Sequence, residues 1–347
     1  MRIVHLLNTS SFSGAENVAI QIIENSGEQN EAYYCSPQGK IGEILQKRGV
    51  RYLPVRKLCV KEIRRIIREI KPDVIHAHDF RAGLLAILAS KKRVPVVSHL
   101  HNNCPWLKKI GVKSLLFRYI AAKCSVLLTV SESVMDEFVF GKRFADKTVV
   151  IGNPIDVKRI QRNIGPGAAI EYDLVFCGRL MEQKNPGLFL EIVKRLSSAF
   201  PRLRAIMLGD GVLRTEVEET IGRLGLENTV TVAGFVDDPV SYMARSRVLV
   251  ITSSWEGFGL VAVEALAAGK PVVASNVGGL PSIVNDRCGA LCNSTDDFVV
   301  ALSQLLSDDG YYSSKCSGAL SRADELNNLE QYMQNINQAY GYALRKK

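Results

Sequence analysis

Short β-rich runs alternate with helical stretches along the first half of the chain. Segments such as RIVHLL and DVIHAH have the length and composition of strands, and VKEIRRIIREIK has the apolar spacing of a helix. Strands that alternate with helices are typical of a parallel sheet with helices on both faces. The predicted strands are 2–7, 51–55, 73–78, 94–101, 124–131 and 148–154, and the predicted helices are 15–26, 60–71 and 81–92.

The alternation stops near the middle of the chain and then begins again. The loop KRIQRNIGPGAAIEY contains proline and glycine without apolar periodicity, and a second series of strands and helices follows it. Because 347 residues is long for one hydrophobic core, we predict two α/β domains, 1–165 and 166–329, with a helix at about 330–347 that packs back on the first. The strands predicted here are 173–178, 204–211, 229–234, 247–253, 271–275 and 289–293, and the helices are 186–199, 212–224 and 261–269.

The amino-acid composition is that of a globular protein without membrane-spanning helices. Hydrophobic residues make up 47% of the chain and charged residues 23%, as in a globular protein. The longest apolar runs are far shorter than the ~20 residues of a membrane-spanning helix. The N-terminal MRIVHLLNTS has no cleavage site after its short apolar core, so we predict a strand there and no signal peptide. The eight cysteines are scattered without a zinc-binding pattern, which favours a reduced, cytoplasmic protein.

Positive charge is concentrated in the first half. Residues 1–150 hold 24 Lys and Arg against 13 Asp and Glu, a balance of +11, whereas the remainder holds 20 against 22, a balance of −2. Such a surface attracts anionic partners, namely nucleic acid, anionic lipid or phosphorylated small molecules.

Residues suited to phosphate binding follow the predicted strands of the second half. Arg179 and Lys184 come just after one strand, and a Gly-Phe-Gly turn after another opens a helix. Free backbone N–H groups and the helix dipole at such a turn bind anions. Because ligands of parallel sheets bind beyond the carboxyl ends of the strands, we predict a diphosphate site here. Either cation taken alone would more often be a solvated surface residue.

Two carboxylates flank this glycine turn. Glu264 lies about one turn into the helix, where it could accept hydrogen bonds from a ribose diol, and Glu256 lies before the turn. A glutamate early in a helix can also simply complement the dipole, which is the alternative for Glu264.

All five histidines lie within the first 101 residues. His76 with His78, and His99 with His101, alternate at the ends of two predicted strands, so each pair shares a face. We expect His76 and His99 to be packed and neutral, and His78 and His101 to emerge in the cleft between the domains. Metal binding is possible, but Asp79 is the one acidic residue at ligand spacing.

The motifs together resemble the retaining glycosyltransferases of family 4, which have the GT-B fold. The matching segments are GRL…K, LGDG, GFV, TSSWEGFGLVAVEALAAGKPVVASNVGGLPSIV and the N-terminal FSGAE, and they cover both predicted domains. The resemblance implies an α/β GT-B protein in which two Rossmann-like domains face a central cleft. It also implies an enzyme that moves a sugar from a nucleotide sugar to a saccharide acceptor.

The resemblance also implies roles for individual residues. Glu264 would hold the ribose, Glu256 would face the donor sugar, and His101 would lie near its anomeric carbon. The implied catalytic residues are Glu256, His101, Arg179 and Lys184, with His78 on the acceptor side. The implied donor-binding residues are Gly14, Gly178, Arg179, Lys184, Gly209, Phe235, Val236, Glu256, Gly257, Phe258, Gly259, Leu260 and Glu264.

This sequence departs from the family pattern at two positions. Ser13 stands where the N-terminal loop usually has a glycine, and Ser282 stands where an acidic residue is common. Ser13 narrows the loop at its expected phosphate contact with Gly14. Ser282 is given no role.

The implied mechanism is retention by front-face attack, in which the leaving phosphate accepts the acceptor's proton. No double-displacement pair of carboxylates is evident. Arg179 and Lys184 would supply the positive charge that stabilises the leaving diphosphate, so no metal or other cofactor is expected. The ribose contact favours a UDP- or GDP-sugar donor.

Residues 104–123, CPWLKKIGVKSLLFRYIAAK, mix aromatic, aliphatic and cationic side chains. That mix suits an interfacial helix on anionic lipid, and lipid-linked acceptors are common in the family. The alternative is an ordinary surface helix with a solvated cationic face. We therefore predict a cytoplasmic enzyme of bacterial-type surface polysaccharide or glycolipid synthesis, with peripheral contact to the inner face of the plasma membrane if the interfacial reading of this segment holds.

Two other functions remain open from the residues. One is a nucleotide-sugar epimerase on the same scaffold, which would need an acid/base carboxylate pair facing the sugar. The other is a basic, non-catalytic protein that binds nucleic acid or membranes. Nucleic-acid binding would need aromatic residues among the basic ones, and residues 51–71 contain only Tyr52, so no nucleic-acid partner is expected.

Overall fold

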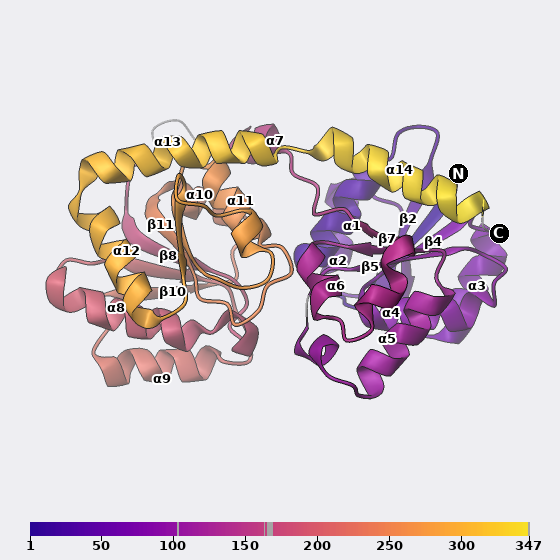
Figure 1. Cartoon of the computed structure of the whole chain (residues 1–347), viewed down its shortest axis with the longest axis horizontal. Coiled ribbons are helices and arrows are strands. Elements are labelled where there is room, and N and C mark those ends of the chain that lie inside the picture. Colours follow the sequence, from indigo (N-terminus) through magenta and orange to yellow (C-terminus); the bar gives the residue numbers. More distant parts are fainter. Residues whose placement is uncertain (103, 163, 165–168, 346–347) are drawn as a thin grey trace. The chain divides into compact units, whose positions relative to one another are not determined.

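The computed structural model describes residues 1–102, 104–162, 164 and 169–345, and it divides the chain into two compact units (Figure 1). Unit 1 comprises Met1–Pro154 and Asn328–Lys347, and unit 2 comprises Ile155–Asn327. Each unit contains one parallel sheet with helices packed on it. The predicted α/β class with two parallel-sheet units is therefore confirmed.

Unit 1 has a seven-stranded sheet in the order β3-β2-β1-β4-β5-β6-β7. The order reverses between β1 and β4, which is the switch point of this sheet, where ligands of open parallel sheets bind. The strands are β1 (Arg2–Leu6), β2 (Glu31–Pro37), β3 (Tyr52–Val55), β4 (Val74–His78), β5 (Val96–Leu100), β6 (Val126–Thr129) and β7 (Thr148–Val150).

Helices cover both faces of this sheet. On one face α3, α4 and α5 lie side by side, and α4 packs on β4 and β5. On the other face the last helix, α14, packs on β4, β5 and β6, so the C-terminus returns to unit 1. The helices of unit 1 are α1 (Gly14–Glu24), α2 (Ile41–Lys47), α3 (Val60–Ile70), α4 (Asp79–Ser90), η1 (Pro105–Lys108), α5 (Val112–Lys123), α6 (Glu132–Glu137), η2 (Gly141–Lys147) and α14 (Leu329–Arg345).

Strand register brings the histidines of unit 1 together. His5 on β1 lies opposite His76 on β4, and His78 at the end of β4 lies opposite His99 on β5. Residues directly opposite each other, or two apart on one strand, share a face of the sheet. Since Tyr340 of α14 contacts His76, this shared face is the one that α14 covers.

Unit 2 has a six-stranded sheet in the order β10-β9-β8-β11-β12-β13. Its switch point lies between β8 and β11. A continuous apolar core lies between the sheet and the helices α8, α9 and α12, with α10 and α11 on the other side (Figure 1). The strands are β8 (Tyr172–Cys177), β9 (Ala205–Leu208), β10 (Val230–Gly234), β11 (Ser246–Ile251), β12 (Val272–Ser275) and β13 (Gly289–Cys292). The helices are α7 (Val157–Arg162), η3 (Glu182–Lys184), α8 (Pro186–Ala199), α9 (Arg214–Leu224), α10 (Pro239–Ala244), α11 (Leu260–Ala267), η4 (Leu280–Ser282), α12 (Thr295–Ser307) and α13 (Asp309–Leu326).

The chain passes between the units at Pro154–Ile155 and again at Asn327–Asn328, whereas the sequence places the first boundary at 165 and the second at 329. The difference at the first boundary comes from α7. Its buried Val157 and its packing against α11 anchor it to unit 2, and Gln161 Nε2 donates to Ala267 O at 3.3 Å. The first part of the predicted loop, 158–162, is therefore helical and belongs to unit 2, whereas its residues 163 and 165–168 lie outside the described residues.

Candidate active site

An ion pair joins the loop after β8 to the loop after β11 in unit 2. Lys184 Nζ is in direct contact with Glu256 Oε2, and the two side chains are only 18% and 12% exposed. Ser253 Oγ donates to the same carboxylate oxygen at 3.3 Å. A pair this well shielded from water depends on both partners, because removing one leaves a buried charge uncompensated.

Side chain-to-backbone hydrogen bonds hold these two loops in register. Thr252 Oγ1 lies 3.0 Å from the carbonyl oxygens of both Lys184 and Asn185. Gln183 Nε2 donates to Trp255 O at 3.1 Å, and Ser254 N donates to Gln183 O at 2.8 Å. Lys184 and Glu256 are therefore positioned by the backbone of both loops. The sequence pointed to Lys184 and Glu256 but gave no role to Gln183 or Thr252.

The glycine turn at 257–259, just before α11, packs closely against another segment of backbone. Gly259 has φ +101°, the left-handed region that favours glycine, and caps the helix. A Cβ on Gly279 would lie 2.5 Å from Gly257 O and 2.8 Å from Phe258 Cα, so the chain after β12 lies directly against this turn. The first N–H groups of α11 have no partner within the helix and carry its positive dipole end.

Glu264 sits on an otherwise apolar helix. Burial raises the pKa of its carboxyl to about 7, and the nearby Asp238 carboxylate adds to the effect. The Glu264 charge in turn raises the pKa of the Cys177 thiol at the end of β8, after the larger effect of burial. Glu264 thus lies at the meeting point of β8, α10 and α11, and its carboxyl is partly protonated at neutral pH.

The other residues predicted for this site differ in exposure. Gly178 and Gly209 pack backbone against backbone, since a Cβ on Gly209 would lie 2.0 Å from Gly178 O. Arg179 is exposed, so it is available to an anion but is not held as Lys184 is. Phe235 is 63% exposed beyond β10, and Val236 is half-buried. Leu260 is half-buried, and Gly257 and Phe258 are buried.

In unit 1, Glu16 holds the N-terminal loop in place. It is the glutamate of the FSGAE motif, and the sequence analysis gave it no role. Glu16, buried in α1, accepts a hydrogen bond from Thr9 Oγ1 at 2.5 Å and one from Ser13 Oγ. Gly14 is exposed at the first position of α1. The serine that departs from the family pattern therefore anchors the loop through Glu16.

The five histidine rings of unit 1 pack into one cluster, in which the hydrogen bonds form two separate branches and ring contacts join them. His5 Nδ1 lies 3.0 Å from His78 Nε2, and His78 Nδ1 lies 2.8 Å from His101 Nε2. A second branch joins His99 Nδ1 to His76 Nε2 at 3.3 Å and His76 Nδ1 to the Tyr340 hydroxyl at 2.8 Å. His5 did not stand out in the sequence. The pairing of β1 with β4 places it here.

Burial keeps this cluster uncharged. It lowers the pKa of His5 to about 3 and that of His101 to about 4, where the Glu16 carboxylate acts weakly in the opposite direction. It also lowers the pKa values of the other three histidines well below their ordinary range. His76 and His99 are fully buried, as expected, but His78 is only 2% exposed and of the predicted pair only His101 reaches half-burial. The expectation that His78 emerges from its strand end into the cleft was therefore wrong, because its side chain is buried within unit 1.

Two consecutive parts of the chain each match a known glycosyltransferase family. Residues 7–159 match the family described as Glycosyltransferase Family 4, and residues 158–319 match Glycosyl transferases group 1. An uncharacterized glycosyltransferase of Methanocaldococcus jannaschii is 30% identical over 273 residues, which is 70% of this chain and 68% of the relative. The chain belongs to the family 4 glycosyltransferases.

More distant similarities agree with this assignment. The Escherichia coli UDP-Gal:alpha-D-GlcNAc-diphosphoundecaprenol alpha-1,3-galactosyltransferase is 26% identical over 346 residues, covering 89% of this chain and 88% of that protein. The crystal structure of Anabaena HepE in complex with UDP and glucose is 22% identical, covers 98% of this chain and 99% of the other, and superposes with a TM-score of 0.86. The glycosyltransferase is thus an enzyme of the GT-B fold, as the sequence predicted.

Proposed function

We propose that this glycosyltransferase transfers a sugar from a UDP-sugar to a lipid-linked saccharide, with retention at the anomeric carbon. The observation that carries the proposal is the arrangement at the switch point of unit 2, where the Lys184–Glu256 pair and the glycine turn meet. A cation, free helix N–H groups and a carboxylate at one strand-end position are the groups that a nucleoside diphosphate sugar needs.

The burial of each residue at this site suggests which part of the donor it would bind. The half-buried Lys184 would exchange part of its contact with Glu256 for the diphosphate, while exposed Arg179 would add a second, more mobile cation. Glu256, released from full pairing, would accept hydrogen bonds from the donor sugar. Glu264 would accept them from the ribose, a contact that its ionised form makes more strongly.

Chemistry in this proposal depends on charge that grows on the leaving diphosphate. Fixed cations and backbone dipoles act most strongly on charge that appears in the transition state. The leaving phosphate would take the acceptor's proton on the face from which it departs. His101 would lie near the anomeric carbon of the donor sugar, and His78 would lie on the acceptor side. We propose that the transfer itself needs no metal, because Lys184 and Arg179 supply the positive charge.

The donor and acceptor classes are supported by the similar proteins. The name of the E. coli relative specifies a UDP-Gal donor and a GlcNAc-diphosphoundecaprenol acceptor, and the Anabaena structure holds UDP. A cytoplasmic enzyme of surface polysaccharide or glycolipid synthesis, peripheral on the inner face of the plasma membrane, fits these acceptors. Among the described residues, no helix is long and apolar enough to cross a membrane.

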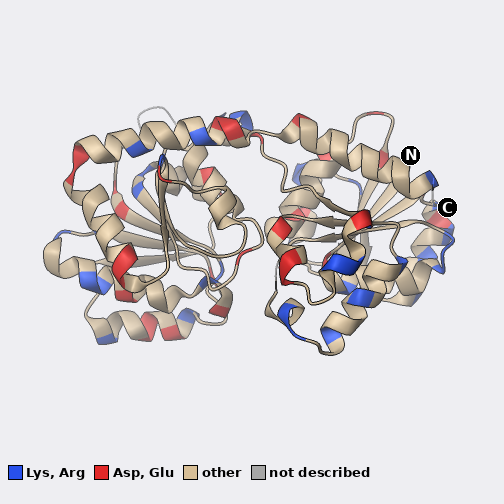
Figure 2. Cartoon of the chain, in the orientation of Figure 1, with Lys and Arg blue, Asp and Glu red and all other residues tan. Residues whose placement is uncertain are grey.

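The segment 104–123 offers a surface for membrane contact. Ile110 is 70% exposed and Val112 is 76% exposed, and Leu115, Leu116 and Tyr119 continue this apolar strip along α5. Figure 2 shows cationic residues along the same helix. Trp106, the tryptophan of this predicted interfacial segment, instead packs against Phe80 and Phe117, with ring centroids at 5.3 and 5.8 Å.

The donor proposal is tested by thermal unfolding with nucleoside diphosphates. A ligand present at about 100 times its Kd stabilises the native state by ~2.7 kcal/mol, which raises the Tm by several degrees. UDP is expected to raise the Tm most, GDP less, and deoxyuridine diphosphate less than UDP because the ribose diol is incomplete. If none of these nucleotides raises the Tm, the donor proposal is wrong.

The acceptor and stereochemical proposals need the reaction product. Incubation of the enzyme with a UDP-hexose and an undecaprenyl-diphosphate-linked sugar is expected to give a disaccharide whose new linkage keeps the α configuration of the donor. The anomeric proton coupling in the NMR spectrum of the product distinguishes the two configurations. A β linkage would contradict retention, and transfer only to soluble saccharides would contradict the lipid-linked acceptor.

A further inference from the structure

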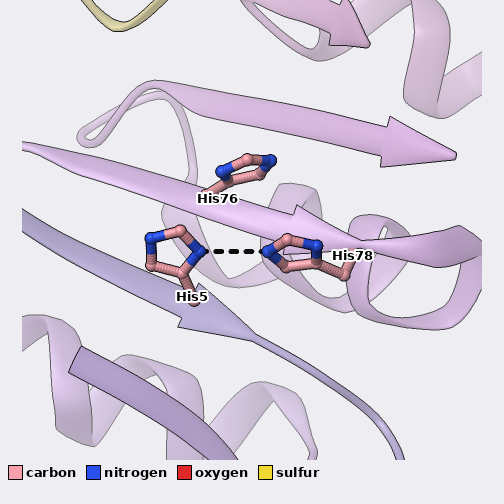
Figure 3. A group of neighbouring side chains, drawn as sticks. All are labelled: His5, His76 and His78. Atoms are coloured by element: carbon pink, nitrogen blue, oxygen red, sulfur yellow. Dashed lines mark hydrogen bonds between the residues drawn. The ribbon is translucent and has the colours of Figure 1, made fainter. Parts of the chain in front are cut away.

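The histidine cluster lies at the switch point of the sheet in unit 1. Its members come from the carboxyl ends of the three adjacent strands β1, β4 and β5, which pair in register. Figure 3 shows the rings of His5 and His78 pointing toward one another from neighbouring strands, with His76 beside them. Such convergence at a strand-end crevice marks a ligand-binding position in open parallel sheets.

Several ring nitrogens of this cluster have no hydrogen-bond partner. Among the described residues, His99 Nε2, His101 Nδ1 and His5 Nε2 are buried and unpaired. A neutral imidazole carries one N–H and one lone pair, so the hydrogen bonds within the cluster can satisfy only part of its nitrogens. Buried polar atoms without a partner are uncommon in native proteins, and two of these three belong to His99 and His101, which lie together at the strand ends.

The separations match those of a metal site. Ligand atoms of His78, His99 and His101 all lie within 4.8 Å of one another, and His78 Nδ1 is 2.8 Å from His101 Nε2. Two nitrogens bound to tetrahedral zinc lie roughly 3.3 Å apart, given bonds of about 2.0–2.1 Å. Small rotations of the imidazoles, whose terminal torsion is broad, bridge the difference.

We propose that His78, His99 and His101 bind one divalent transition-metal ion, represented here by Zn²⁺. Three neutral imidazoles suit this class of ion, and they leave a fourth position open for water or another ligand. His5 would hold the ligand ring of His78 in place through the 3.0 Å contact between His5 Nδ1 and His78 Nε2. His78 Nδ1 would then bind the ion in exchange for its present contact with His101 Nε2.

A second group, His5, His76 and His78, also has the spacing of a metal site. All three of its members are fully or almost fully buried, whereas His101 is half-buried and gives an ion a route from solvent. The proposed ion therefore sits on the His101 side. Its binding is independent of the proposed transfer reaction, which we do not expect to require it.

The test is a titration of the full-length protein with Co²⁺, whose visible absorption reports tetrahedral nitrogen ligation, followed by displacement with Zn²⁺. One equivalent is expected to bind, and His101→Ala should weaken binding at least about 100-fold, more than His5→Phe, which loses a supporting hydrogen bond. His101→Gln serves the same purpose if the alanine variant does not fold, and circular dichroism checks folding. Cys104→Ser, three residues along the chain, is the matched control and should bind as the wild type does.

Four results would overturn the proposal. They are the absence of stoichiometric binding, a thiolate-to-cobalt charge-transfer band that Cys104→Ser removes, wild-type affinity in His101→Ala, and a larger loss in His5→Phe than in His101→Ala. The last of these would place the ion in the fully buried group. None of the readouts uses nucleotide or sugar, so failure here leaves the proposed function untouched.

Discussion

The two units use the same sheet topology at their switch points but fill them with opposite chemistry. In unit 1 the strand ends carry neutral, buried histidines that bond to one another. In unit 2 the strand ends carry a lysine–glutamate pair, a second exposed cation and crowded glycine backbone. The fold thus specifies where a ligand can bind, and the residues at the strand ends decide which ligand it is.

The difference also concerns how each position is supported. The unit 2 site is fixed by backbone approaches that leave no room for a Cβ and by hydrogen bonds between two loops. The unit 1 cluster is fixed by strand register and by a hydroxyl from the last helix. Substitutions should therefore affect charge and rate at one site, and packing and hydrogen bonding at the other.

The largest effect is expected from Lys184→Ala. Loss of one preorganised charge donor costs on the order of 10²–10³ in kcat, because the charge matters most as the diphosphate leaves. Steady-state kinetics with the donor that the nucleotide screen identifies measure this loss. Lys194→Ala, an exposed lysine of the same unit, should have normal kcat.

Lys184→Ala also leaves Glu256 without its partner, and a double variant separates the two effects. Adding Glu256→Gln removes the unpaired charge, so any part of the loss that comes from disrupted structure should be recovered while the loss of the cation remains. Full recovery of the rate in the double variant would mean that Lys184 only neutralises Glu256.

Gly279→Ala should be the next largest change. Its Cβ would meet Gly257 O at 2.5 Å, so the loop must shift, at a cost of about 2–3 kcal/mol of unfolding free energy. Thermal or urea unfolding measures it. Gly187→Ala in α8, where the nearest atom to the new Cβ is 3.9 Å away, is the control and should be neutral or slightly stabilising. Equal stabilities of the two variants would contradict the close approach.

Glu264 gives unit 2 a pH dependence. Its pKa is raised from 4.5 to about 7 on folding, so the folded state holds the proton more tightly. Stability from this group is full below pH 4.5 and is lost as the pH rises to about 7, a change of roughly 1–3 kcal/mol. Glu264→Gln should remove this dependence, matching the wild type near pH 4.5 and exceeding its stability at pH 8. Parallel stability curves for the two proteins between pH 4.5 and 8 would contradict it.

The smallest effect is expected in unit 1. Tyr340→Phe removes the hydroxyl that meets His76 Nδ1 at 2.8 Å and should lower the unfolding free energy by about 1 kcal/mol. Because this network is neutral, the loss should not change between low and high salt, unlike a loss of surface ion pairs. A salt-dependent loss would show that the cluster carries charge.

Pattern alone predicted the sheets because most strands are apolar runs flanked by polar turns. It missed β2, whose sequence EAYYCSP mixes polar residues and proline, and it missed α12 and α13. Arg179, Lys184 and the glycine turn could be proposed because glycine and charged residues at strand ends are visible in one dimension, and the family resemblance supplied most of the other proposed donor-site residues. Glu16, Gln183 and His5 could not be named from the sequence. Glu16 acts through hydrogen bonds within the N-terminal loop, Gln183 through a contact between two loops, and His5 through the register of β1 with β4.

The position of the first boundary, the packing of Trp106 and the burial of His78 have a similar explanation. Each depends on which neighbour a segment packs against, and local composition does not encode that choice. The helix α7 resembles a linker in sequence yet packs on α11. Trp106 fits a lipid-facing strip in sequence yet contacts two phenylalanines.

The central claim is that the switch point of unit 2, and not that of unit 1, receives the nucleotide. Hydrogen–deuterium exchange with and without saturating UDP tests it most directly, because it reports both positions in one experiment. The account predicts slower exchange in residues 178–184 and 252–264, with the strand ends at 76–78 and 99–101 little changed. Slower exchange confined to the histidine strand ends, or none in residues 178–184 and 252–264 while UDP is bound, would contradict it.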